Sequence, residues 1–169
     1  MAKLAISTVI NRPVEEVFAV VSNPENYPKW ISSSNDVKIT SEGPIGVGTT
    51  FRTVVKALGR RIEGEIEITE YEPKRRYATK SKSGPFPVEN QSTFERVDGG
   101  TRVTFTTVAE PGGFFKLAEP LLVSMVKRQF EADFANLKDL METHALRARD
   151  ATGKRCSFGF VGHPPVPIF

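Results

Sequence analysis

The sequence lacks the residue patterns that are typical of disulfides, metal sites and membrane spans. Its single cysteine, Cys156, cannot form a disulfide within the chain, so we expect a protein of the reducing cytoplasm. Its two histidines, His144 and His163, lack an acidic or cysteine partner at ligand spacing, and we expect no metal and no other cofactor. The apolar runs fall far short of the ~20 residues of a membrane span.

Signatures of enzymatic machinery are also missing. There is no Gly-x-Ser-x-Gly motif, and Cys156 lies in an irregular C-terminal stretch, so the sequence predicts no catalytic nucleophile. Gly46-Val47-Gly48 opens a predicted strand rather than a helix, and it therefore lacks the helix N-terminus that binds a phosphate. The sequence identifies no catalytic residue. We favour a protein that is not an enzyme and leave the question open.

The charge of the chain is mild. The formal net charge is +3, from 23 Lys+Arg and 20 Asp+Glu, which is not typical of a dedicated nucleic-acid-binding protein. We interpret the basic clusters as solvated edges of loops and strands; alternatively, they attract the protein to anionic lipid headgroups. These clusters are Arg60-Arg61, Lys74-Arg75-Arg76 and Lys80-Ser81-Lys82.

The length of 169 residues fits one domain with a sizeable core. We predict that this domain covers residues 1–148. Residues 149–169 form a tail of Gly, Pro and apolar residues without periodicity, to which we assign no function. The first ten residues, MAKLAISTVI, lack the long apolar region and the cleavage site of a signal peptide, so we expect none.

Two short helices are predicted after the first strand. Pro13 suits a first helical position, and the VEEVFAVV that follows has apolar residues at helical spacing. In NPENYPKW, residues 23–30, Asn23 can cap a second helix, but Pro28 sits too far inside for that helix to be long and regular. From Asn35 the apolar period changes to two, as in strands. The predicted strands are residues 3–10, 35–41, 49–58, 60–72, 76–82, 87–97 and 101–109.

Two neighbouring strands, TFRTVVKAL and RIEGEIEITEYE, have complementary outer faces. In each strand one face is mostly apolar, while the other carries bases in the first strand and acids in the second. Opposite charges favour antiparallel pairing of the two strands. Each exposed pair contributes at most ~1 kcal/mol, so the charges set register more than stability. The inward set of the second strand is Ile62, Gly64, Ile66 and Ile68.

The period returns to 3.6 after Glu110-Pro111-Gly112-Gly113 and predicts a helix of about thirty residues. We expect Pro120 to kink or interrupt this helix near its start, because an interior proline costs ~3 kcal/mol. The charged residues, Asp133 among them, are expected mostly to face away from the core. The predicted buried stripe is Leu122, Met125 or Val126, Phe130, Phe134, Leu137 and Met141.

These elements can bury their apolar faces together only if the sheet is curved. The predicted fold is therefore α+β: a seven-stranded curved antiparallel sheet wrapped around the long C-terminal helix, with the two short helices closing one end.

Four segments match a pattern known from one superfamily: INRPVEEVFAVVSNPENYPKW, GPIGVGTTF, GGTRVTFTT and GGFFKLAEPLLVSMVKRQFEADFANLKDLMET. Together they span about residues 3–143, and they resemble the SRPBCC superfamily of START-related and polyketide-cyclase-like proteins. The resemblance implies a helix-grip fold in which Tyr27 and Trp30 plug one end. It implies function only broadly, because this superfamily includes carriers, cyclases, hydrolases and co-chaperones.

The inward faces of the predicted strands are apolar, with scattered hydroxyl groups and one amide, as is typical of a small-molecule pocket. Each buried hydroxyl without a partner would cost ~1–3 kcal/mol, so we favour a real cavity over the alternative of a solid core. Tyr77 is the best polar candidate for orienting a ligand; alternatively, it is an amphipathic wall residue. The predicted ligand-binding residues are Trp30, Phe51, Thr53, Val55, Ile66, Tyr77, Thr79, Asn90, Ser92, Phe94, Phe105, Phe130 and Phe134.

The lining and the resemblance together favour binding, with transport as one version, of a small hydrophobic or amphipathic ligand such as a lipid, isoprenoid or polyketide. One alternative is an enzyme that resembles polyketide cyclases or dehydratases, in which Tyr77, Asn90 and Ser92 orient a flexible polyketone. A further alternative is an interaction module like the co-chaperone or coenzyme-Q-binding branches, with an exposed apolar patch. We expect no stable membrane insertion, no nucleic acid, and a monomer or homodimer; transient membrane contact stays an open alternative.

Overall fold

The computed structural model describes residues 2–57, 59–84, 87–110 and 119–144. Its strands are β1 (Ala2–Ile10), β2 (Ser34–Ile39), β3 (Thr50–Ala57), β4 (Arg60–Glu72), β5 (Arg76–Ser81), β6 (Val88–Val97) and β7 (Gly100–Ala109). Its helices are α1 (Val14–Val21), the 3₁₀ turn η1 (Pro24–Asn26), α2 (Tyr27–Trp30) and α3 (Glu119–Glu142). Each predicted strand is present within a residue or two of its predicted bounds.

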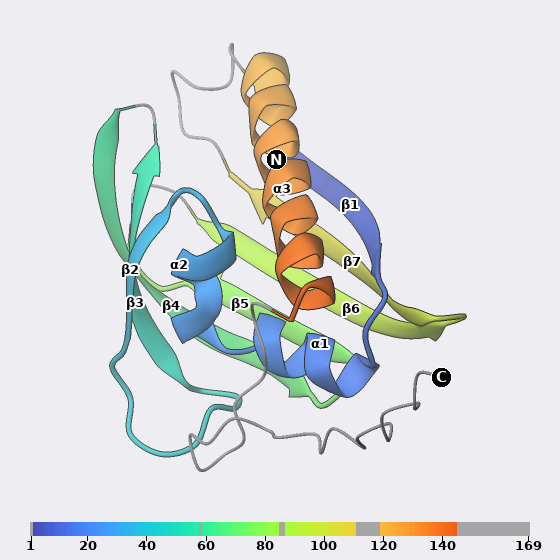
Figure 1. Ribbon diagram of the computed structural model, residues 1–169. Coiled ribbons are helices and arrows are strands. Elements are labelled where there is room, and N and C mark those ends of the chain that lie inside the picture. The colour runs from blue at the N-terminus through green and yellow to red at the C-terminus, as the bar shows by residue number, and fades with distance from the viewer. Residues whose placement is uncertain (1, 58, 85–86, 111–118, 145–169) are drawn as a thin grey trace, which may run out of the picture.

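The seven strands form one antiparallel sheet in the order β1-β7-β6-β5-β4-β3-β2. The sheet curves around α3, which crosses its concave face, and α1 and α2 lie against the same side (Figure 1). The predicted α+β helix-grip architecture is therefore confirmed. The concave side is called the inner face below, and the convex side the outer face.

The segment NPENYPKW forms two consecutive short helical turns, where the sequence predicts a single short or distorted helix capped by Asn23. The Asn23 side chain accepts a hydrogen bond from the backbone N–H of Glu25 at 3.1 Å and so caps η1. Pro24 and Pro28 each stand in the first turn of their element, where the missing N–H costs nothing. This arrangement turns the Tyr27 and Trp30 rings inward from a short, stiff segment.

The pairing of β3 with β4 follows the predicted faces. Phe51 pairs with Ile66 and Thr53 with Gly64 on the inner face, while Arg52 and Glu63 form an outer ion pair at 3.1 Å. The register shifts between Ile68 and Glu70, so Thr69 is an extra residue in β4. Because of this bulge, Tyr71 pairs with Tyr77 and joins the inner face.

The burial of α3 changes along its length. Phe134, Leu137 and Met141 are buried as predicted, whereas Met125 and Val126 are 50% and 43% exposed, so the predicted stripe is wrong at its N-terminal end. Pro120 stands in the first described turn of α3, where it interrupts no part of the described helix. The expected outward position of Asp133 is also wrong, since its side chain is only 2% exposed.

Candidate functional site

The inner face of the sheet is built from side chains that align in rows across the strands. One row runs Tyr71–Tyr77–Ser92–Phe105–Ile6 through β4, β5, β6, β7 and β1. Phe105 in this row contacts the Phe130 and Phe134 rings of α3, with centroids 4.9 and 5.4 Å apart. This row therefore faces α3, and so do residues two positions away on the same strands.

Aromatic rings close the interior beside α1 and α2. The Phe18 ring of α1 packs edge-on against Phe94 and Tyr71, with centroids 5.1 and 5.2 Å apart. The Tyr27 ring meets Phe51 at 5.8 Å and Trp30 at 6.0 Å. Such edge-to-face pairs add stability beyond their burial. We call Phe18, Tyr27, Trp30, Phe51, Tyr71, Tyr77 and Phe94 the aromatic floor.

Two phenols in the aromatic floor bind each other. The Tyr27 and Tyr77 hydroxyl oxygens lie 2.8 Å apart in a hydrogen bond. Burial raises the pKa of both phenols above the ordinary value of about 10, and the neighbouring Tyr27 contributes further to the shift at Tyr77. Both groups therefore stay neutral at physiological pH, so Tyr77 is not available as a base.

A polar row lies next to the aromatic one. Thr79, Asn90 and Thr107 are neighbours across β5, β6 and β7, and strand alternation places them on the inner face. Thr79 and Thr107 are buried, and the side-chain carbonyl oxygen of Asn90 is buried without a hydrogen-bond partner among the described residues. A buried acceptor without a donor costs about 1–3 kcal/mol, so a hydrogen-bond donor that reached the Asn90 oxygen would stabilise this row.

The predicted ligand-binding residues come together on this inner face and on the helices that cover it. The buried ones are Trp30, Phe51, Thr53, Tyr77, Thr79, Ser92, Phe94, Phe105 and Phe134. The partly buried ones are Val55, Ile66, Asn90 and Phe130. Their gathering agrees with a lining, while their contact with a ligand stays a prediction.

The sequence analysis missed a buried carboxylate on α3. One oxygen of Asp133, Oδ1, accepts hydrogen bonds from the Ser32 N–H at 3.0 Å, the Ser32 hydroxyl at 2.8 Å and the Gln129 amide at 3.0 Å. Gln129 also donates to the Ser32 hydroxyl. The other oxygen, Oδ2, is buried without a described partner. These contacts fix the segment after α2 against α3, a role that helical spacing alone does not reveal.

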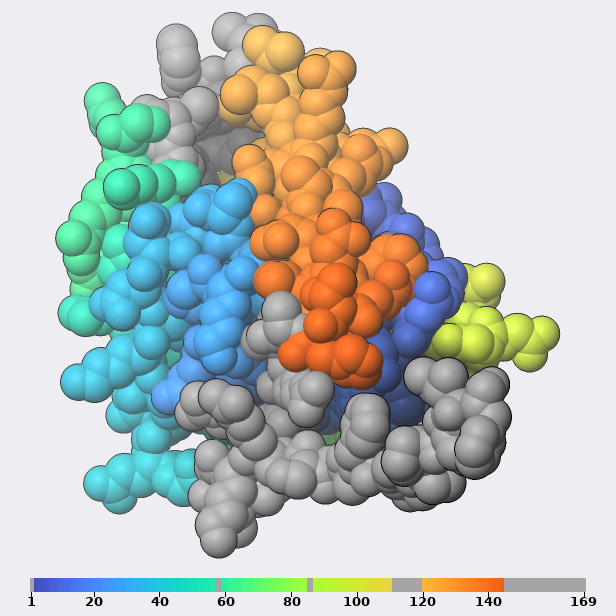
Figure 2. Space-filling view, in the orientation of Figure 1, coloured from blue at the N-terminus to red at the C-terminus, as the bar shows by residue number. Residues whose placement is uncertain are grey.

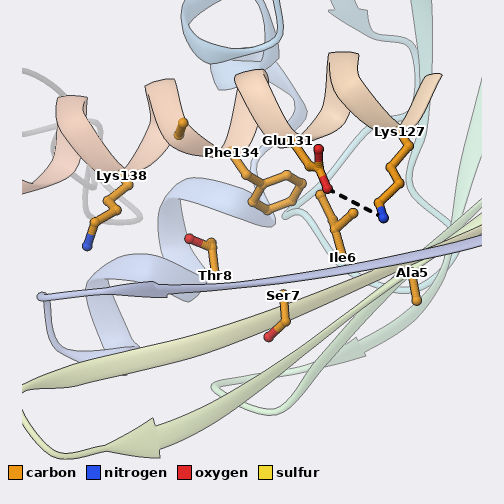
Figure 3. Close-up of a pocket in the computed structure, with 9 residues that line it drawn as sticks. Ala5, Ile6, Ser7, Thr8, Lys127, Glu131, Phe134 and Lys138 are labelled. Atoms are coloured by element: carbon orange, nitrogen blue, oxygen red, sulfur yellow. Dashed lines mark ion pairs between the residues drawn. The ribbon is translucent and has the colours of Figure 1, made fainter. Parts of the chain in front are cut away.

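Two hollows open on the surface near this lining. The first, of about 350 Å³, lies between β1 and α3, where Ile6 and Thr8 point toward the helix and Phe134 points toward the strand (Figure 3). Lys127 and Glu131 form an ion pair at 3.8 Å across its rim. The second, of about 450 Å³, lies over the outer face around Ala78, Gln91 and Thr106. Thr79 and Asn90 of the polar row also line it.

Neither metal ligands nor membrane-spanning helices were found in the part of the chain that the structure describes. Among the described residues, no three His, Cys, Asp or Glu side chains gather in a way that could hold a metal ion. None of the described helices combines the length and apolar character needed to cross a membrane.

Comparisons with known proteins agree with this geometry. A protein of Mycobacterium tuberculosis whose function is uncharacterized is 30% identical over 105 residues, which are 59% of this chain and 60% of that protein. The matching part of the chain thus spans less than two thirds of this curated relative. Among solved structures, the ZhuI aromatase/cyclase from Streptomyces sp. R1128 has a TM-score of 0.70 and 18% identity, over 90% of this chain and 99% of that one.

A START superfamily protein from Mycobacterium smegmatis is similar to the same degree, with a TM-score of 0.70 and 15% identity over 84% of this chain and 98% of that one. Both structures share the helix-grip fold with this chain. The family described as "Polyketide cyclase / dehydrase and lipid transport" matches residues 1–142, from β1 to the end of α3. The chain therefore belongs to this polyketide cyclase/dehydrase and lipid transport family, within the SRPBCC superfamily.

Proposed function

We propose that the protein binds a small hydrophobic or amphipathic ligand between the inner face of the sheet and the N-terminal half of α3. The family, whose description includes lipid transport and polyketide cyclisation, supports this class of ligand. Lipids, isoprenoids and polyketides all combine an apolar body with few polar groups. Such a molecule suits an interior lined by aromatic rings and hydroxyl groups.

The position of the ligand follows from the burial of α3. Met141, Leu137, Phe134, Phe130 and Val126 recur on the core-facing side of the helix, at spacings of three or four residues. The first three are buried, Phe130 is partly buried, and Val126 is 43% exposed. Side chains of described residues fill the interior beside α1 and α2, whereas the described residues before Phe130 on α3 include no buried one: Leu122 and Val123 are partly buried and Val126 is exposed. The proposed ligand lies against this less buried half of α3.

The observation that carries the proposal is the unpartnered carbonyl oxygen of Asn90. It lies on the inner face between Thr79 and Thr107, no described residue donates to it, and a hydroxyl group of a ligand or a water molecule would satisfy it. A ligand that presents a hydroxyl group to Asn90 gains a hydrogen bond, while its apolar body rests on the rings around it. The preferred ligand therefore carries a donor, which makes it amphipathic.

Two probes that differ by one hydroxyl group test this assignment. Calorimetric titration should show that 2-naphthol binds up to about tenfold more tightly than naphthalene, the value of one net hydrogen bond. The variant Asn90→Leu should bind both probes equally, because it removes the acceptor and keeps the apolar volume. Gln91→Leu, on the outer face, is the control and should keep the wild-type preference. No binding of either probe would contradict the pocket.

An enzyme that resembles polyketide cyclases is a second candidate. Tyr77 and Ser92 are direct cross-strand partners, and Asn90 is on the same face of β6 as Ser92, so the three proposed orienting groups lie close together. Positioning alone can contribute about 7–11 kcal/mol to such a cyclisation, without an acid or a base. Incubation with a linear poly-β-ketone, followed by product analysis by mass spectrometry, separates the two candidates: turnover supports the enzyme, and stoichiometric binding without turnover supports the carrier.

A further inference from the structure

The N-terminal half of α3 exposes apolar side chains. Leu121 is 67% exposed, Met125 50% and Val126 43%. Leu121 and Met125 are four residues apart and share one side of the helix, so they form a continuous apolar edge. Figure 2 shows this part of α3, in light orange, at the surface of the molecule. Three large apolar side chains within two turns exceed the scattered exposure that any protein surface shows.

Basic side chains lie at the same end of the molecule as this apolar edge. Lys56, Arg60 and Arg61 lie at the tip of the β3–β4 hairpin, and Arg128 follows the apolar residues on α3. Figures 1 and 2 place the hairpin tip and the start of α3 at the same end. All four side chains are exposed, and none forms an ion pair with a described residue. This contrasts with Lys80, Lys82 and Arg102, which are paired with glutamates.

We propose that this end, defined by Leu121, Met125, Val126, Arg128, Lys56, Arg60 and Arg61 and called the docking end, binds the surface of an anionic phospholipid bilayer. The inference rests on the proposed function, because the docking end lies where α3 leaves the interior uncovered and a membrane ligand could pass. The unpaired cations are complementary to anionic headgroups. The apolar residues are exposed and line neither of the two hollows described above, so they suit a fluid apolar phase better than a folded partner. Binding of this kind lies on the membrane and does not span it.

Co-sedimentation with vesicles tests the docking end directly. The full chain should sediment with vesicles of 70% phosphatidylcholine and 30% phosphatidylglycerol (about these proportions) and much less with phosphatidylcholine alone. Each basic residue near an anionic surface changes the binding constant severalfold, so the double variant Arg60→Glu/Arg61→Glu should bind the anionic vesicles at least about tenfold more weakly. The double variant Leu121→Glu/Met125→Glu should lose binding to a similar extent.

A matched control changes the same charge at the opposite end. Arg75→Glu/Arg76→Glu alters two exposed arginines beside α1, where Lys74 pairs with Glu15, and should keep wild-type binding. Circular dichroism melts of all variants should coincide, because every altered side chain is exposed. Equal loss in the control variant would overturn the proposal, since it would indicate attraction by net charge alone.

Two further outcomes would also overturn it. One is no sedimentation of the wild type with either vesicle. The other is a concentration-dependent dimer in light scattering that Leu121→Glu/Met125→Glu abolishes, which would make the apolar edge an interface between copies of the chain. The naphthol titration contains no vesicle, so its result does not depend on the docking end. If the protein binds naphthol but no vesicle, the pocket assignment stands and the docking end is wrong. If it binds vesicles but no naphthol, the docking end stands and the pocket assignment is wrong.

Discussion

The two ends of α3 differ in how completely the side chains around them are buried and hydrogen-bonded within the protein. At the C-terminal end, Phe134, Leu137 and Met141 are buried against the sheet, and the aromatic floor closes the interior. At the N-terminal end, Leu121 and Met125 face solvent, and the Asn90 carbonyl oxygen has no donor among the described residues. The same helix thus completes a core at one end and leaves apolar and polar groups without partners at the other. In our proposals, the less completely packed half binds the ligand and the bilayer surface.

The strongest test of this comparison removes one large side chain from each end. Phe51→Ala deletes a ring that is fully buried in the aromatic floor, and it should lower the free energy of unfolding by about 3–5 kcal/mol. Leu121→Ala removes an exposed side chain and should change it by less than about 0.5 kcal/mol. Urea denaturation followed by circular dichroism measures both. A loss at Leu121 as large as that at Phe51 would mean that the two ends are equally packed.

A second test concerns the polar contact that joins α2 to α3. Asp133→Ala removes the acceptor for the Ser32 N–H, the Ser32 hydroxyl and Gln129, and should destabilise the protein by about 2 kcal/mol. Asp139→Ala, a change of the same type at an exposed position of the same helix, should be nearly neutral. Comparison of the two urea midpoints gives the result. If Asp133→Ala leaves the urea midpoint unchanged, apolar packing alone attaches α2 to α3.

Most of the fold follows from sequence periodicity. The strand bounds, the β3–β4 register and the two proline-bounded helical turns rest on local patterns, namely alternation, paired charges and the position of each proline. The bulge at Thr69 was not predicted, although the alternation of RIEGEIEITEYE breaks there: continued strictly after Ile68, it places acidic Glu70 on the inner face. Consequently Tyr71, which strict alternation assigns to the outer face after Ile68, enters the aromatic floor.

The candidate site was predictable only in part. Inward residues such as Phe51, Tyr77 and Phe105 follow from alternation, and the structure brings them together. The errors concern α3, where Asp133 was expected to face away and Met125 or Val126 to be buried. A helical stripe says which side of a helix is apolar, but not where along the helix the sheet stops covering it. That boundary depends on the curvature of the sheet, which no local pattern encodes.

The smallest expected effect concerns the phenol pair at the closed end, and it distinguishes a buried hydrogen bond from an accessible ligand group. Tyr77→Phe removes the 2.8 Å hydrogen bond to Tyr27 and should cost about 1 kcal/mol near neutral pH. The free energy of unfolding of the wild type should also depend on pH in the alkaline range. Because burial raises the pKa of both phenols in the folded protein, the unfolded chain releases these protons first, near pH 10.

The stabilisation from neutral phenols is therefore complete below pH 10 and is lost as the pH rises above it. Urea denaturation of the wild type between pH 8 and pH 11 (about the range that brackets the unfolded pKa) should show this decline, and Tyr77→Phe should show a shallower one. In the double variant Tyr27→Phe/Tyr77→Phe the two losses should not add, since both single changes break the same bond. Additive losses, or an unchanged alkaline slope, would place these hydroxyl groups in contact with solvent and open the end of the interior that the aromatic floor closes.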